Sequence, residues 1–372
     1  MNKNTEKSKN LIAEEVSSLD DYDYEDSSNE SDNNCSNNCK LVTEKEIVQK
    51  GNYVLHIAAT PEESCNIAVG TSKKTCEIYR LGENQLAKLE SFGEFESPIV
   101  GVQFSPEDTN LIYCGVENGN VKLWDLRNPD NYVLQFSENK PDDVKRFASF
   151  DVASNNRLLC ASTELHKGDA FILFWDIRNV NLMGGYWESH SDTITQVKFD
   201  PNNVNKLISG SLDGLINLYD LKYTSEDESL MDCFNTESPI DYLQWFDRKG
   251  KDCISCFTSL GNVQLWSTDD VEPYANFHRA EIAKAMNLKS EAHCYIISAH
   301  KQKGEELLVL AGSKYRNGEY VKCLYTNNKK LESLCSLNGN NQLIRSSMYN
   351  PYYFILAEQL KNTCKNCVYC IV

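Results

Sequence analysis

The sequence predicts an all-β fold made of seven similar four-stranded units. Seven strand-like stretches end in an aromatic residue, at positions 44 to 59 residues apart: Tyr79, Trp124, Trp175, Tyr219, Trp266, Tyr325 and Tyr369. In two of these stretches, residues 121–125 and 172–176, the aromatic residue is Trp followed by Asp. A repeat near 40–45 residues that closes on Trp-Asp is typical of a propeller blade. We therefore expect a seven-bladed β-propeller over residues 41–372.

The fourth unit shows the expected strands most clearly. Residues 195–199, 206–211 and 215–220 are strand-like stretches separated by turn-forming residues. Asp213-Gly214 is a typical tight turn between the last two of these strands. Residues 102–106 open the second unit in the same way as residues 197–201 open the fourth.

The two ends of the chain are expected to meet in one blade. Tyr369 lies three residues before Val372, so the last blade has three strands of its own. Apolar residues at positions 41–42 and 47–48 precede the first blade and have no other expected partner. An N-terminal strand is therefore predicted to complete the last blade and close the ring, which removes an exposed sheet edge.

Residues 1–40 are predicted to form a disordered acidic arm. They contain ten acidic side chains against four lysines, and residues 20–30 offer almost nothing to bury. Low hydrophobicity with self-repelling charge opposes folding. Two interpretations remain open, a solubilising tail or a regulated arm that docks basic partners.

The bulk composition limits the partners and the compartment. The 372 residues carry a net charge of −17, which argues against direct binding to nucleic acid because phosphates require a basic surface. The N-terminus has no apolar signal segment, and no apolar run approaches the length of a membrane span. We expect a protein of the cytoplasm or nucleus, with its 15 cysteines reduced, that is a monomer within a larger complex.

These repeats resemble the WD-repeat propeller family. The resemblance implies a buried hydrogen-bonded set of His, Ser or Thr, Asp and Trp in each blade. The fourth blade matches it best, with His190, Ser209 or Ser211, and Asp213, although Tyr219 stands where Trp is expected. The other matches are partial: Trp124 with Asn118 at the Asp position in the second blade, and Trp175 with Asp169 in the third.

A narrower resemblance is carried by residues 188–199, residues 209–214 and an unusual Thr163-Glu164 insertion before Trp175-Asp176. This set is similar to the WD repeat-containing protein 89 family. That resemblance implies a scaffold and no known chemistry.

Two arginines are candidate partner-binding residues. Trp124-Asp125-Leu126-Arg127 and Trp175-Asp176-Ile177-Arg178 share the pattern Trp-Asp-x-Arg in consecutive blades. This resembles the motif by which propeller substrate receptors dock onto the adaptor of cullin-4 ubiquitin ligases. Guanidinium groups that project from adjacent blades are suited to bidentate contacts with an acidic surface. The alternative is that each arginine pairs locally at the end of its strand.

The cysteine and histidine patterns do not predict a metal site, a cofactor or an active site. Cys364, Cys367 and Cys370 form two overlapping Cys-x-x-Cys steps, and Cys253 with Cys256 forms another. Structural zinc needs four convergent ligands, whereas side chains three apart on a strand face opposite ways. No histidine lies in a recognised catalytic motif and no glycine-rich phosphate loop is present.

Two connections between blades are unusually rich in sequence features. Residues 223–229 form an acidic loop, interpreted either as a solvated loop or as a contact for a basic partner. Residues 278–286 form a short predicted helix whose Ile282 and Met286, four apart, are expected to pack onto the propeller.

The sequence thus predicts a non-catalytic scaffold for protein–protein interactions. The leading specific hypothesis is a substrate receptor of a cullin-4 ubiquitin ligase. The alternative is a structural scaffold in a nuclear or nucleolar assembly that binds basic partners through the acidic arm and the loops.

Overall fold

The structure is a computed structural model of the chain. It describes residues 41–46, 52–82, 85–138, 140, 142–301, 307–314, 320–327, 329–337, 343–350, 352–359 and 367–371. For residues 41–46, 353–354, 357–359 and 367–371 it describes the backbone alone. The predicted acidic arm, residues 1–40, lies outside the described residues, as do Ile47 and Val48.

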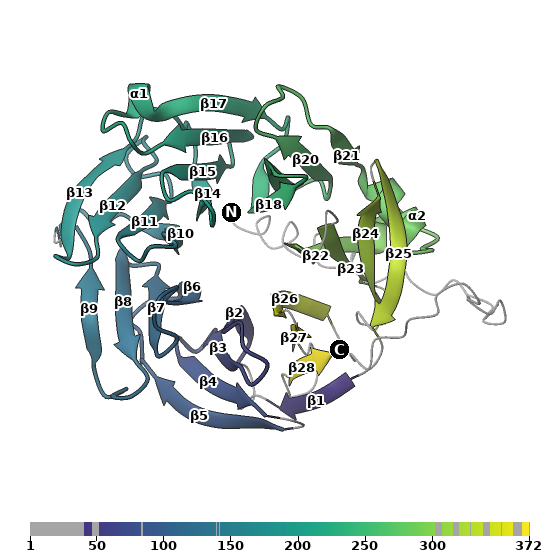
Figure 1. Cartoon of the computed structure of the whole chain (residues 1–372), viewed down its shortest axis with the longest axis horizontal. Coiled ribbons are helices and arrows are strands. Elements are labelled where there is room, and N and C mark those ends of the chain that lie inside the picture. Colours follow the sequence, from purple (N-terminus) through teal and green to yellow (C-terminus); the bar gives the residue numbers. More distant parts are fainter. Residues whose placement is uncertain are drawn as a thin grey trace, which may run out of the picture. The chain divides into compact units, whose positions relative to one another are not determined.

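The described strands form seven antiparallel sheets of four strands each. Six sheets consist of four consecutive strands, and the seventh joins β1 (Leu41–Glu46) to β26–β28. Neighbouring sheets contact one another through their innermost strands, in a circle that returns from β26 to β2 (Figure 1). The prediction of an all-β propeller is confirmed.

Each sheet runs from an innermost to an outermost strand. The innermost strands are β2 (Val54–Ala59), β6 (Ile99–Phe104), β10 (Phe147–Val152), β14 (Ile194–Phe199), β18 (Ile240–Arg248), β22 (Cys294–Lys301) and β26 (Leu343–Asn350). The second strands are β3 (Asn66–Thr71), β7 (Leu111–Val116), β11 (Leu158–Thr163), β15 (Lys206–Ser211), β19 (Lys251–Thr258), β23 (Leu307–Ser313) and β27 (Tyr353–Gln359). The third strands are β4 (Cys76–Leu81), β8 (Asn120–Asp125), β12 (Ile172–Asp176), β16 (Leu215–Asp220), β20 (Val263–Ser267), β24 (Val321–Asn327) and β28 (Cys367–Ile371). The outermost strands are β5 (Leu86–Phe92), β9 (Tyr132–Phe136), β13 (Asn181–Tyr186), β17 (Leu230–Asn235), β21 (Ala275–Phe277), β25 (Lys330–Leu337) and β1.

The described connections contain three short helices. They are α1 (Glu226–Ser229), α2 (Arg279–Ala285) and the 3₁₀ helix η1 (Glu291–His293). Ile282 and Met286 are fully buried in the apolar cluster between the fifth and sixth blades, so the expected packing of this segment is confirmed. None of the helices that the structure describes is long and apolar enough to cross a membrane.

The seven repeated aromatic residues all lie on third strands, as the repeat predicts. Tyr79, Trp175, Tyr219 and Trp266 are fully buried, because the third strand has sheet on both sides and neighbouring blades above and below. In all seven sheets the pairing of the first and second strands shifts register near the start of the first strand. Such bulges increase the local twist, which suits strands that converge on an axis.

Adjacent blades interlock through glycines of the second strand. A Cβ added to Gly115 would lie 2.4 Å from Cδ1 of Phe150, which comes from the next blade. In the same way, a Cβ added to Gly210 would lie 2.9 Å from Cγ2 of Ile240 in the next blade. Only glycine leaves room for a large apolar side chain to press against the backbone here, so these residues fix the spacing of the blades.

The N-terminal strand pairs with the last blade, as predicted. Residues 41–46 run antiparallel to residues 367–371, with Leu41 opposite Ile371 and Glu46 opposite Cys367. β1 thereby covers the edge of β28 that its own blade leaves open.

Removal of residues 1–46 is expected to destabilise the whole propeller, whereas removal of residues 1–35 is expected to leave it unchanged. The longer deletion abolishes the β1–β28 pairing and exposes the backbone of β28. At about 1.5 °C per kcal/mol for a chain of this length, the loss of several backbone hydrogen bonds should lower the melting temperature by at least about 5 °C. Circular dichroism melts of the two truncated chains beside the full chain test this, and coincident melts for both truncations would contradict it.

Candidate protein-interaction site

The fourth blade contains a hydrogen-bonded chain centred on His190, which lies between β13 and β14. Its Nδ1 is 3.0 Å from Oδ2 of Asp213, and its Nε2 is 2.7 Å from Oγ of Ser209. Burial raises the pKa of Asp213, but the hydrogen bond and charge of His190, together with hydrogen bonds from the backbone of Leu215 and Ser191, outweigh this and hold the pKa below the ordinary value. The arrangement ties the connection between blades to the second strand.

Tyr219 occupies the place of the expected tryptophan in this blade. The Ser209 hydroxyl donates to Tyr219 Oη at 3.4 Å, and Asn217 Nδ2 lies 3.4 Å from the same oxygen. Ser211 has a different position, because its hydroxyl donates to the Asp192 carbonyl at 3.0 Å. The structure thus brings His190, Ser209, Asp213 and Tyr219 together and places Ser211 at the neighbouring turn.

Two other blades use a residue that the sequence analysis missed, two positions before the aromatic residue. Tyr79 Oη donates to the Glu77 carboxylate, which also pairs with Lys88 Nζ at 3.1 Å. Trp266 Nε1 donates to Gln264 Oε1 at 3.3 Å. Residues i and i−2 lie on the same face of a strand, so a Glu or Gln at that position is the sequence signal for this contact.

The third blade is arranged differently from the expected set. Trp175 Nε1 donates to the Ser137 carbonyl at 3.3 Å, whereas Asp169 is exposed and bridges to His166 only through its backbone. The imidazole–carboxylate pair here joins His166 Nε2 to Asp143 Oδ1 at 2.8 Å. The two residue types are exchanged relative to the fourth blade: here the acid, Asp143, comes from the connection between blades, whereas in the fourth blade the histidine does. Asp169 and Trp175 are therefore not brought together.

Trp124 is buried in the second blade, and its indole N–H has no hydrogen-bond partner among the described residues. Asn118, at the position of the expected Asp, accepts from Asn120 Nδ2 at 3.0 Å instead. No polar set like that of the fourth blade forms around Trp124.

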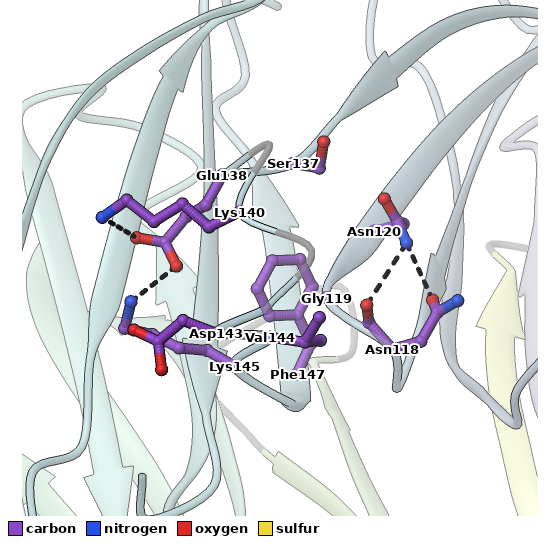
Figure 2. Close-up of a pocket in the computed structure, with 10 residues that line it drawn as sticks. All are labelled: Asn118, Gly119, Asn120, Ser137, Glu138, Lys140, Asp143, Val144, Lys145 and Phe147. Carbon is purple, nitrogen blue, oxygen red and sulfur yellow. Dashed lines mark hydrogen bonds and ion pairs between the residues drawn. The ribbon is translucent and has the colours of Figure 1, made fainter. Parts of the chain in front are cut away.

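A polar pocket of about 330 Å³ lies between the second and third blades. Figure 2 shows Asn118 and Asn120 on one side and the connection that carries Glu138 and Lys145 on the other. Lys145 Nζ is 2.6 Å from Glu138 Oε2 and 4.6 Å from the centre of the Phe171 ring. The charged lining residues thus all have partners, Glu138 and Lys145 with each other and Asp143 with His166 and Lys167 outside the pocket, and the lining contains no histidine or cysteine.

Arg127 and Arg178 form the same fork at the ends of β8 and β12. Nε and Nη2 of Arg127 lie 2.8 Å from the two carboxylate oxygens of Asp125. The corresponding distances from Arg178 to Asp176 are 2.9 and 2.7 Å. The local pairing considered in the sequence analysis is therefore present in both blades. It orients each guanidinium and offsets part of its charge.

Both guanidinium groups remain accessible at the surface. Each side chain is 60% exposed, and Nη1 of neither arginine has a partner among the described residues. Arg127 has one further contact, 3.3 Å from Nη2 to Oδ2 of Asp108. The second and third blades thus present equivalent arginine donors at the same position, just after the third strand.

The cysteines of the fifth blade face opposite sides of β19. Cys253 is buried in the cluster shared with the sixth blade, and Cys256 in the cluster shared with the fourth. Burial raises the pKa of Cys253 to about 11, so its thiol stays protonated. Within the described ranges no three His, Cys, Asp or Glu side chains are grouped to hold a metal ion. The side chains of Cys35, Cys39, Cys364, Cys367 and Cys370 lie outside the described part of the chain.

Comparison with known proteins identifies the repeats. The family described as "WD domain, G-beta repeat" matches residues 87–125 and 184–220. WD repeat-containing protein GTS1 of Arabidopsis thaliana is 25% identical over 66% of this chain. The WD repeat-containing protein 89 homolog of Dictyostelium discoideum is 24% identical over 52%, and U3 small nucleolar RNA-associated protein 15 of Saccharomyces cerevisiae is 26% identical over 64%.

The chain spans less than two thirds of each of these relatives: 61%, 49% and 44% of their lengths, respectively. The resemblance of the repeats to the WD-repeat family is confirmed.

Two histidines of the innermost strands predict a dependence of stability on pH. Burial lowers the pKa of His56 and of His300 to about 4. His300 Nε2 lies 2.8 Å from the Ser298 hydroxyl and 2.9 Å from that of Ser347. A depressed pKa in the folded state means stability that is complete above the unfolded value near 6.5 and is lost as the pH falls towards 4.

We expect the free energy of unfolding to drop by about 1.4 kcal/mol per pH unit for each of the two histidines between about pH 6 and pH 4. Urea unfolding at half-unit pH steps measures this slope. His56→Gln and His300→Gln should each reduce the slope, whatever their effect at pH 8. An unchanged slope in both variants would show that neither histidine is responsible.

Proposed function

The chain belongs to the WD-repeat proteins, and we propose that it is a non-catalytic scaffold that presents loops and strand ends to other proteins. Interlocked blades hold these loops in place, and loops on a rigid frame are where recognition residues usually lie. The antiparallel sheet of β1 and β26–β28 is then the seventh, closing blade. The His190, Asp213, Ser209 and Tyr219 set has a stiffening role in the fourth blade.

The leading specific function is that of a substrate receptor of a cullin-4 ubiquitin ligase. The observation that carries it is the repeated fork of Arg127 with Asp125 and of Arg178 with Asp176. Because Asp takes one edge of each guanidinium, the remaining N–H groups are held in a fixed direction for an acidic partner. Pre-oriented arginines lose little conformational entropy on binding, which favours them as anchors.

An Arg127→Ala/Arg178→Ala double variant is expected to lose the cullin-4 adaptor while keeping its fold. Exposed ion pairs contribute little to stability because water screens them, so the melting temperature should barely change. Binding of the purified adaptor to the purified full chain, measured by calorimetry, gives the answer. We expect a loss of at least about tenfold in affinity.

The fourth blade offers a matched control. Lys222 stands two residues after Asp220, the spacing that Arg127 and Arg178 have from their aspartates, and its Nζ lies 3.8 Å from Asp220 Oδ2. Lys222→Ala should leave adaptor binding intact. Absence of adaptor binding to the wild-type chain, or equal binding to the double variant, would refute the receptor function.

The second candidate is a scaffold in a nuclear or nucleolar assembly. It is supported by the similarity to a relative named as U3 small nucleolar RNA-associated, and by the net charge of −17, which favours basic protein partners. This candidate places the protein in the nucleus. Partners purified with the tagged chain should then dissociate as the salt concentration rises, and the Arg127→Ala/Arg178→Ala variant should retain them.

A further inference from the structure

Trp187 differs from every other tryptophan of the chain. Of the five tryptophans, Trp124, Trp175, Trp245 and Trp266 are buried, whereas Trp187 is 48% exposed. It follows β13 directly, in the connection from the third to the fourth blade. A large aromatic surface left in water on a folded protein is a frequent mark of a binding site.

The backbone that carries Trp187 is held by one carboxylate from the acidic loop. Glu226 accepts from the backbone N–H groups of Trp187, Glu188 and Ser189, at 2.7, 3.0 and 2.8 Å. Three consecutive N–H groups that converge on one anion form a nest, a rigid backbone arrangement. Figure 1 shows the same relation, with the end of β13 next to α1 of the following blade. Trp187 is therefore presented in a fixed position.

Apolar side chains extend this surface across the third and fourth blades. The Phe171 ring lies 6.4 Å from the Trp187 ring, centre to centre. Leu165 and Leu212 are 46% and 38% exposed, and both are anchored through Thr193: Leu165 N donates to its Oγ1 at 3.1 Å and Leu212 N to its carbonyl at 3.0 Å.

The charges around Trp187 are predominantly negative. Glu188 is adjacent to Trp187, and Glu164 precedes Leu165. Neither carboxylate has an ion pair or hydrogen bond among the described residues, in contrast to Glu226. Three cations of the adjoining connections already have partners, because Lys145 pairs with Glu138, Arg146 with Glu117 and Lys167 with Asp143. The surface thus combines an exposed indole with two unneutralised carboxylates.

We propose that this surface binds an arginine-bearing segment of a partner protein. The guanidinium stacks on the Trp187 indole, which favours cations over its face, and donates to the carboxylates of Glu164 and Glu188. Apolar residues of the segment contact Leu165 and Leu212. A nucleic acid would bring phosphates to an acidic surface, so the charge selects a basic peptide. The inference rests on the proposed protein-binding function and identifies the chemistry of one partner.

Trp187 also supplies the measurement. Because the other tryptophans are buried, acrylamide quenching of the intrinsic fluorescence of the full chain reports chiefly on Trp187, and Trp187→Phe verifies the assignment. The probe is a synthetic nonapeptide of three Gly-Arg-Leu repeats, blocked at both ends. We expect it to protect Trp187 from quenching in a saturable manner. The same peptide with Glu in place of Arg should give no protection, and the one with Lys should bind several-fold more weakly.

Two double variants, each of which removes two negative charges at a different place, distinguish binding at this surface from general attraction of a basic peptide to an acidic protein. Glu164→Gln/Glu188→Gln should weaken the arginine peptide about tenfold. Asp270→Asn/Glu272→Gln removes the same charge at exposed residues of the fifth blade and should have no effect. Glu164 and Glu188 make no described side-chain hydrogen bond, so the first pair should fold normally, which circular dichroism verifies.

Three results would overturn the proposal: no protection by the arginine peptide up to millimolar concentration, equal weakening by the two double variants, or equal protection by polyuridylic acid. None of them depends on adaptor binding by Arg127 and Arg178. The receptor function and the arginine-binding surface therefore fail or survive separately.

Discussion

The architecture depends on a close contact between blades, in which a side chain of one first strand presses on a glycine of the preceding second strand. Ile99 meets Gly70, Phe150 meets Gly115 and Ile240 meets Gly210. Each contact buries apolar surface on both blades and sets their separation by the thickness of a bare backbone. Because the ring is closed, a change in one spacing must be absorbed by all the others. The loops at the blade junctions inherit this rigidity, and one of them, between β13 and β14, carries Trp187 and Glu188.

The buried aromatic residues of the third strands find hydrogen-bond partners in different ways. Tyr79 donates to Glu77, Trp266 to Gln264 and Trp175 to a backbone carbonyl, while only the fourth blade uses His190 and Asp213. These solutions share one property, a hydrogen-bond partner for the polar atom of the ring; Trp124 is the exception, because its buried indole N–H has no partner among the described residues. An unsatisfied buried donor costs about 1–3 kcal/mol, whereas the identity of the acceptor matters less. The family pattern can therefore disappear from most blades without loss of the fold.

The fold was predictable because it follows from the regular spacing of aromatic residues along the sequence. The sites were only partly predictable, because they depend on contacts between distant segments. The spacing of Trp124, Trp175 and Tyr219 predicts three neighbouring blades without any knowledge of their side-chain partners. The reversed pair of His166 and Asp143 could not be foreseen, since it joins an insertion to a connection 23 residues away. The nest around Glu226 spans 37 to 39 residues and uses backbone donors, which leave no mark in a side-chain pattern.

The two proposed surfaces differ in how the protein handles its own charges. Arg127 and Arg178 are each paired with an aspartate. A partner must therefore displace that aspartate or bind the guanidinium N–H groups that the aspartate does not use, and both require a matching shape as well as negative charge. Glu164 and Glu188 have no such internal partner among the described residues, whereas Glu226 accepts hydrogen bonds from the backbone of Trp187, Glu188 and Ser189 and fixes it. Contacts to pre-paired arginines select for shape, whereas unpaired carboxylates beside an indole select for a cation.

The arginines end third strands of the second and third blades, and Trp187 lies at the junction of the third and fourth, so the third blade contributes to both surfaces. A scaffold of this kind can hold two chemically different partners on opposite faces of one rigid ring, since Arg178 follows the last residue of β12 whereas Trp187 follows the end of β13 that pairs with the first residue of β12.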